Sequence, residues 1–327
     1  MNRKKKIIFI IICLLVFLVG IIAFRFLRDK DDTYSTEYTE SGRENAVVYD
    51  GKSYQYNEHL SNYLFMGIDT RETVEGEHAR AENGRADAIY LLSYDRVKKT
   101  VKSIAIPRDT IANIHVYAAD GTDLGMTKDH INMQYLYGDG KTKSCQLMKE
   151  SISTLLYGIP IQGYCALNMD GIPEAVKVLG GVNLIVPDKT LEKVNPKFKE
   201  GAEVTITEVD AEQFVRYRDT QQSQSAMDRM NRQKVFMEAF VDTAKKQAVN
   251  DAGLVVNLYN GVKPYMVTNM GTDLFAQLLE ATYDNDNKIT DIPGEKVDGI
   301  DFDEYHISET QLHELILQMF YQELQDN

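Results

Sequence analysis

The stretch from Gly84 to Thr110 most constrains the fold, because it has the pattern of two strands joined by a short polar turn. Residues 87–94 are apolar and β-prone, and residues 100–106 alternate before becoming apolar. Antiparallel pairing would gather four charged residues at one end of a sheet: Arg85, Asp87, Arg108 and Asp109. Such charges are costly to bury and need partners. The pattern indicates either a structural ion-pair cluster or a site for a phosphate and a metal.

The distribution of charge limits the ligands that this chain can bind. The 327 residues carry a net charge of -13, and residues 1–32 hold seven basic and three acidic groups, a net of +4. The remainder therefore carries -13 - 4 = -17. Nucleic-acid binding needs a basic surface, so nucleic acid is not an expected partner. An anionic ligand would need a local cluster of arginines.

The N-terminus has the pattern of a membrane anchor. Residues 1–6 are basic, and residues 7–27 form an apolar run long enough to span a bilayer. Basic residues before the run predict a cytoplasmic N-terminus, with the rest of the chain outside the cell membrane. A cleaved signal peptide is the alternative, but the run is long and no clear small-x-small cleavage site follows it. The polar residues 28–59 are expected to form an extracellular stalk.

The rest of the chain alternates between strand and helix patterns, which favours an α/β fold. Further strands are expected at 63–68, 161–168, 182–186 and 288–292. Helices are expected at 129–137, 144–157, 171–179, 210–218, 227–247, 251–260, 271–282 and 308–324. Asp210 is a candidate N-cap, and residues 120–128 have the composition of a turn.

A second group of arginines lies further along the chain, with a glutamine after the last of them: Arg216, Arg218, Arg229, Arg232 and Gln233. In a helix, Arg229 and Arg232 would share a face. The guanidinium offers a planar fork of donors that suits phosphate oxygens. The alternative is a solvated face whose arginines pair with nearby carboxylates.

Two carboxylates at strand ends are candidate metal ligands. Asp69 and Asp87 could hold magnesium beside phosphate oxygens. Alternatively, Asp69 is a turn residue and Asp87 pairs with Arg85. Asp109 could orient Arg108 or act as a base. Cysteines at 145 and 165 could pair or remain free thiols, and no GxSxG, Walker or GxGxxG motif is present.

Seven motifs, in order and spacing, resemble the LytR-CpsA-Psr family, with the similarity covering about residues 60–247. They are the segments at 65–71, 84–87, 103–110, 158–161, 179–182, 214–218 and 229–233. The resemblance implies a single-domain α/β sandwich, with a central mixed sheet flanked by helices on both faces and a lipid chain in an apolar groove. Residues 248–327 would be an α/β extension packed on this catalytic domain.

The resemblance also implies a function. Family members are membrane-anchored bacterial phosphotransferases that move a glycopolymer, such as teichoic acid or capsule, from polyprenyl pyrophosphate to a peptidoglycan sugar hydroxyl. By motif match, Asp69 and Asp87 would hold magnesium, or manganese. The residues expected to clamp the pyrophosphate are Arg85, Arg108, Arg216, Arg218, Arg229 and Gln233, and Arg232 matches a frequent family arginine. Hydrolysis of lipid-linked pyrophosphates and non-catalytic binding of polyprenyl lipids are the alternatives.

Overall fold

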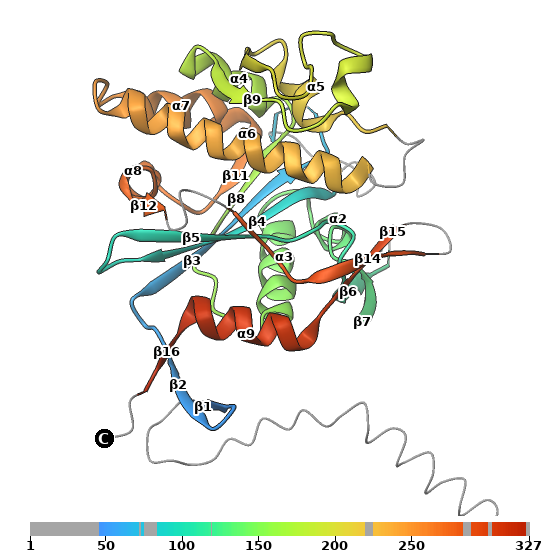
Figure 1. Ribbon diagram of the computed structural model, residues 1–327. Helices are drawn as coiled ribbons and strands as arrows, with labels where there is room; N and C mark the ends of the chain where they lie inside the picture. The colour runs from blue at the N-terminus through green and yellow to red at the C-terminus, as the bar shows by residue number, and fades with distance from the viewer. Residues whose placement is uncertain are drawn as a thin grey trace, which may run out of the picture. The chain divides into compact units, whose positions relative to one another are not determined.

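The structure is a computed structural model that describes residues 46–71, 73–74, 84–118, 120–219, 225–283, 289–299 and 303–324 (Figure 1). The expected anchor at residues 7–27 lies outside these residues. Within the described ranges, no helix has both the length and the apolar composition needed to cross a bilayer. The chain divides into two compact units: a larger one of residues 57–321, and a smaller one formed by the segments that precede and follow it.

The larger unit is built on a seven-stranded mixed sheet, which confirms the expected central sheet. Its order is β11 (Met266–Thr268), β8 (Gly163–Asn168), β3 (Leu60–Ile68), β4 (Ala86–Asp95), β5 (Thr100–Ala105) and β12 (Thr282–Tyr283), with β13 (Thr290–Asp291) also on β5. β3 pairs in parallel with β8, and β12 and β13 pair in parallel with β5. The remaining pairings of this sheet are antiparallel, including the expected β4–β5 hairpin.

Residues beyond 247 supply both edges of this sheet. β11 extends it beyond β8, and β12 and β13 extend it beyond β5. β13 falls within the strand expected at 288–292, whereas the short strands β11 and β12 were not expected. The C-terminal segment is therefore part of the sheet that carries the hairpin.

Helices cover both faces of the sheet, as expected (Figure 1). On one side lie α3 (Thr142–Leu155) and α9 (Glu309–Phe320), and on the other lie α4 (Gly171–Leu179), α6 (Ser225–Ala248) and α7 (Leu254–Val262). The remaining helices are α2 (Met133–Leu136), α5 (Ala211–Arg216) and α8 (Thr272–Glu280), with short 3-10 turns at Thr190–Lys193 and Lys263–Tyr265. Gly180 ends α4 in the left-handed conformation at φ 68°, which a glycine adopts without strain.

Three two-stranded ribbons complete the unit. β9 (Val182–Ile185) pairs with β10 (Glu203–Ile206), β6 (Ile111–Tyr117) with β7 (Asp123–His130), and β14 (Gly294–Asp298) with β15 (Asp303–Ile307). The first ribbon packs with α4, α5 and α6 around a buried cluster that includes Phe198, Phe214 and Phe236. A second buried cluster joins Tyr63 and Cys165 of the sheet to Leu278 of α8.

Three local expectations were only partly right. Of the turn expected at 120–128, only residues 120–122 connect β6 to β7, and residues 123–130 form β7, because they pair with β6 along their length. The helix expected at 129–137 is reduced to α2, since β7 continues through His130. Asp210 occupies the N-cap position of α5, as expected, but its side chain makes no capping hydrogen bond; its carboxylate accepts hydrogen bonds from Thr207 and Lys197 instead.

The smaller unit contains a three-stranded sheet in the order β1 (Ala46–Tyr49), β2 (Lys52–Tyr56) and β16 (Tyr321–Glu323). β1 and β2 form an antiparallel hairpin within the span expected to be a stalk. Lys52 pairs with Glu323 at 2.9 Å. In the larger unit, Cys145 and Cys165 are both buried free thiols.

Candidate functional site

The site lies where β3 ends and β4 begins. Ile68 pairs with Ala86 and Gly67 with Ala88, so Asp87 is an extra residue on β4 at this point. Such a β-bulge re-aims side chains, and bulges are common beside active sites. Gly84 has φ +74°, and a Cβ added there would lie 2.3 Å from Thr70 Cγ2. A glycine is therefore required for the chain to enter β4 beside Asp69, whose N–H donates to Arg85 O at 2.9 Å.

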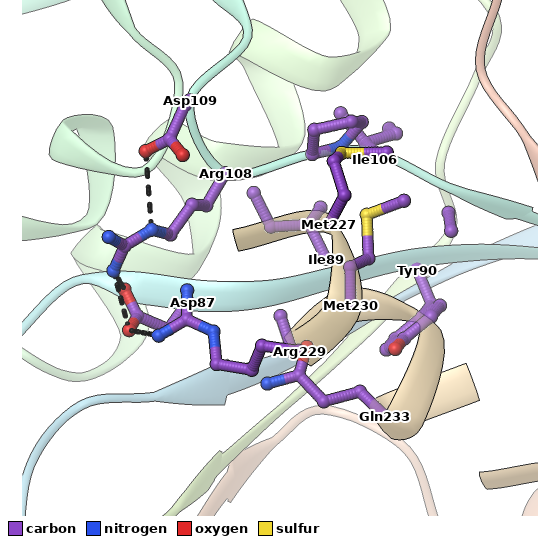
Figure 2. Close-up of a pocket in the computed structure, with 13 residues that line it drawn as sticks. Asp87, Ile89, Tyr90, Ile106, Arg108, Asp109, Met227, Arg229, Met230 and Gln233 are labelled. Atoms are coloured by element: carbon purple, nitrogen blue, oxygen red, sulfur yellow. Dashed lines mark hydrogen bonds and ion pairs between the residues drawn. The ribbon is translucent and has the colours of Figure 1, made fainter. Parts of the chain in front are cut away.

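Arg108 joins the two charged ends of the hairpin (Figure 2). Its Nη1 donates to both carboxylate oxygens of Asp87, each at 2.8 Å, and its Nε lies 3.2 Å from Asp109 Oδ1. Burial opposes the charged form of Arg108, but Asp87 and Asp109 outweigh this effect and raise its pKa. The expected meeting of the hairpin's charges is confirmed, with Arg108 rather than Arg85 as the partner of Asp87.

Arg229 reaches the same carboxylate from α6. Its Nη1 lies 3.4 Å from Asp87 Oδ2, and its side chain is only 9% exposed. Among the described residues, no hydrogen-bond partner reaches its Nε. Burial and the nearby charges of Arg108 and Arg218 lower the pKa of Arg229, although Asp87 and Asp109 oppose the shift. Arg108 and Arg229 thus share the Asp87 carboxylate, with Asp109 as a second carboxylate on Arg108, and the Nε of Arg229 is a donor that a further anion could accept from.

Two further arginines of the site, Arg216 and Arg218, are paired with carboxylates. Arg216, at the end of α5, donates to Asp69 Oδ1 at 3.1 Å and to Glu212 Oε1 at 3.2 Å. Arg218 donates to Asp303 Oδ2 of β15 at 3.1 Å. The Nζ of Lys296, on β14, lies 3.1 Å from the same oxygen. Arg85 is exposed beside this cluster.

Arg232 and Gln233 have different surroundings from Arg229, although all three lie on α6. The side chain of Arg232 is 0% exposed and donates to Thr190 Oγ1 at 3.1 Å and to the carbonyl of Tyr217. Burial lowers the pKa of Arg232 despite the nearby charge of Asp188. Arg232 therefore fixes the segment before Arg218 against α6. Gln233 Nε2 donates to Val215 O at 3.1 Å and fixes the end of α5 in the same way.

Two cavities meet beside these residues. A small cavity has charged side chains at one end, from Asp87, Arg108, Asp109 and Arg229, and apolar side chains such as Ile106 and Met230 along the rest (Figure 2). A second, of about 330 Å³, lies between the sheet and the helices α6, α7 and α8, and is lined mainly by apolar side chains. Ala88, Tyr90 and Gln233 line both cavities. An anionic head and an apolar tail could be bound side by side.

The metal ligands implied by the family resemblance are Asp69 and Asp87. Their strands are neighbours, and their carboxylates belong to the oxygen ligands that magnesium prefers. Within the described residues, no group of three or more His, Cys, Asp or Glu side chains is placed to hold a metal. Two carboxylates are enough for magnesium, which keeps several waters. The two carboxylates are therefore ligands of the right type, although in the structure Asp87 is paired with Arg108 and Arg229, and Asp69 with Arg216.

Sequence reasoning did not identify several residues of the site. They are Glu212, which pairs with Arg216; Lys296 and Asp303, which pair with each other beside Arg218; and Tyr90, which lines the cavities. Asp303 is 85 residues from its partner Arg218, and neither it nor Lys296 belongs to a recognisable motif. Glu212 could have been found, because it precedes Arg216 by one helical turn.

Fold and site together define a class: an α/β protein that can hold an anionic group on arginines beside an apolar cavity. The model of the LytR_cpsA_psr family matches residues 26–320. The chain belongs to this family.

Two relatives and one solved structure illustrate the similarity. The chain is 30% identical over 195 residues to a Halalkalibacterium halodurans protein named polyisoprenyl-teichoic acid–peptidoglycan teichoic acid transferase TagU, a match that covers 59% of this chain and 57% of that relative. It is 26% identical over 340 residues to the Enterococcus faecalis protein of the same name, covering 100% of this chain and 98% of the relative. The crystal structure of TagV from B. subtilis aligns with 80% of this chain and 96% of its own, at a TM-score of 0.59 and 24% identity, and shows the same fold.

Proposed function

We propose that this protein is a phosphotransferase that moves a glycopolymer, such as teichoic acid or capsule polymer, from a polyprenyl pyrophosphate carrier to a peptidoglycan sugar hydroxyl. The observation that carries this proposal is that Arg108 and Arg229, at one end of a small cavity, lie next to an apolar cavity of about 330 Å³ that shares part of its lining with the first. A polyprenyl pyrophosphate likewise has an anionic pyrophosphate joined to an apolar chain. The names of the two relatives support teichoic acid and peptidoglycan as substrates.

The arginines would bind the pyrophosphate and stabilise the charge that develops on its oxygens. Arg108 and Arg229 are the innermost, because both are largely buried at Asp87. Arg216, Arg218 and the exposed Arg85 do not line either cavity, and they would bind the phosphate nearer to the sugar. Cationic groups fixed before the reaction need little reorganisation in the transition state, which makes them effective in phosphoryl transfer.

In the transfer, the acceptor hydroxyl forms a bond to the phosphorus that carries the glycopolymer, the bond from that phosphorus to polyprenyl phosphate breaks, and the hydroxyl proton passes to the leaving polyprenyl phosphate or to solvent. Magnesium would supply further charge neutralisation, and Asp69 and Asp87 would hold it. Asp109 contacts Arg108 Nε, so we assign it an orienting role on that arginine. No protein nucleophile is needed, because the hydroxyl attacks directly.

We also propose that the protein is held in the cell membrane by residues 7–27, with the catalytic domain outside the cell. The support is the sequence pattern of a basic head followed by an apolar run. An outer location would place the site next to both the lipid carrier and the peptidoglycan. Protease accessibility of the domain in intact cells tests the orientation.

The function is tested with the full chain in detergent, a polyprenyl-pyrophosphate-linked glycopolymer, labelled peptidoglycan oligomers and magnesium. We expect glycopolymer to attach to the oligomers and polyprenyl phosphate to be released in equal amounts. Both products should be lost with Asp87→Ala and with Arg108→Ala. Release of polyprenyl phosphate with no glycopolymer attached to the oligomers would indicate hydrolysis instead. Binding without either product would indicate a lipid-binding protein and overturn the proposal.

A further inference from the structure

We propose that the hydroxyl of Tyr90 is a hydrogen-bond donor to the lipid phosphate, at the point where the anionic head of the carrier joins its apolar chain. This inference rests on the proposed function, because it assigns a further binding residue to the same substrate. Tyr90 lies on β4, three residues beyond Asp87, and is paired with Phe65 of β3 and Ala105 of β5.

The first observation is that the Tyr90 hydroxyl has no partner. Tyr90 is only 5% exposed, and no hydrogen-bond partner reaches its hydroxyl among the residues that the structure describes. Buried tyrosine hydroxyls are normally hydrogen-bonded, and a buried unpaired hydroxyl lowers stability. A phenylalanine would fill the same space without this cost. The hydroxyl is therefore better explained by a ligand than by the fold.

The second observation is the position of Tyr90 between the two cavities. It lines both the small cavity that has Arg108 and Arg229 at one end and the large apolar cavity. Only Ala88 and Gln233 share this property among the described residues, and the Gln233 amide already donates to Val215 O. Figure 2 shows Tyr90 beside α6, apart from the charged cluster of Asp87, Arg108 and Arg229. Tyr90 therefore offers a donor at the boundary between the two environments.

The protonation state of Tyr90 fits a donor. Burial, together with the charges of Asp291 and Glu238, raises its pKa well above the ordinary value, although Arg229 opposes the shift. The hydroxyl thus keeps its proton at neutral pH. A polyprenyl chain has no acceptor along its length, so the first acceptor that enters this boundary is an oxygen of the phosphate attached to the chain.

The test compares Tyr90→Phe with wild type in the full chain, using two readouts. Geranylgeranyl pyrophosphate is the probe, because it has an anionic head and an apolar chain but no sugar. We expect Tyr90→Phe to bind it about fivefold to tenfold more weakly, the usual effect of losing one hydrogen bond. The melting temperature without ligand should be unchanged or higher, since an unpaired buried hydroxyl has been removed. If the hydroxyl served only the fold, its removal would lower the melting temperature and leave the affinity for the probe unchanged.

The control is Tyr63→Phe, on the neighbouring strand β3. Tyr63 is similarly buried, at 8% exposure, and does not line either cavity. Its affinity for the probe should match that of wild type. Equal affinity of Tyr90→Phe and wild type would overturn the role of Tyr90 and leave the proposed function intact. Failure of the wild-type protein to bind the probe would overturn both.

Discussion

At the scale of single residues, two arginines one helical turn apart on α6 have different roles. Arg229 faces Asp87 at the charged end of the small cavity, whereas Arg232 is buried against Thr190 and the carbonyl of Tyr217. The sequence places both on one face of a helix, and only the partners from other elements separate them. Arg232 is thus fully buried, which fits neither a phosphate clamp nor the solvated face that was the alternative, while Arg229 has the surroundings of a ligand-binding residue.

Substitution by glutamine should separate the two arginines. Arg232→Gln removes one partner of a buried cluster, so the free energy of unfolding should fall by about 3 kcal/mol. Arg229→Gln leaves Asp87 paired with Arg108 and relieves repulsion from Arg108 and Arg218, so stability should change by no more than about 1 kcal/mol. Its affinity for pyrophosphate should fall about tenfold or more, the value of a hydrogen bond to a charged group.

Urea unfolding and calorimetric titration of pyrophosphate measure these two effects. Wild type and both variants are compared in the same buffer. The distinction would be wrong if Arg232→Gln were as stable as wild type, or if Arg229→Gln bound pyrophosphate with unchanged affinity.

At the scale of elements, the ribbon of β14 and β15 supports the site although it lies far from it in sequence. Asp303 of β15 pairs with Arg218 and Lys296. The Tyr305 N–H donates to Asp109 O at 2.8 Å, and its hydroxyl donates to Ile292 O at 2.7 Å. The ribbon thus holds both an arginine of the site and the turn that carries Arg108.

The substitution Gly294→Ala should test whether the ribbon of β14 and β15 supports the site. A Cβ at Gly294 would lie 2.4 Å from His306 O, a backbone atom that cannot move without disturbing β15. Gly294→Ala should therefore cost about 1–3 kcal/mol of stability and weaken pyrophosphate binding by displacing Asp303. Gly271→Ala is the control, because nothing lies within 4 Å of an added Cβ there. If Gly294→Ala unfolded more easily but bound pyrophosphate like wild type, the ribbon would have no role in the site.

The elements that could be predicted from sequence are those whose pattern is local. The β4–β5 hairpin, α3, α4 and α6 were expected because their periodicity is continuous along the chain. β7 was missed because most of its residues are exposed and turn-prone, and its strand form depends on pairing with β6. The partnership of Arg218 with Asp303 was missed because it is a long-range contact. The motif match located the charged residues but could not assign their partners.

At the scale of the whole molecule, pH acts on stability through two opposing effects. The net charge of -13 at pH 7 causes self-repulsion that weakens as pH falls towards the pI of 5.0. Against this, some carboxylates stabilise the fold only while ionised. Burial alone would raise the pKa of Asp95, but the N–H groups of Lys98 and Val97 outweigh it and lower the pKa. Burial would likewise raise the pKa of Asp210, but hydrogen bonds from Lys197 and Thr207 outweigh it and lower the pKa.

The sign of the second effect follows from these lowered values. A carboxylate with a folded pKa below its unfolded value contributes stability above the unfolded pKa, and loses it as pH falls through the folded pKa. We therefore expect the free energy of unfolding to be level or rising from pH 7 to about pH 5, and to fall below about pH 4. Asp95→Asn should be less stable than wild type at pH 7, and this difference should shrink at pH 3. Urea unfolding at each pH measures it, with Glu208→Gln, an exposed carboxylate near Asp210, as the control. A difference between Asp95→Asn and wild type that is the same at pH 7 and pH 3 would show that the charge of Asp95 is not what stabilises the β4–β5 turn.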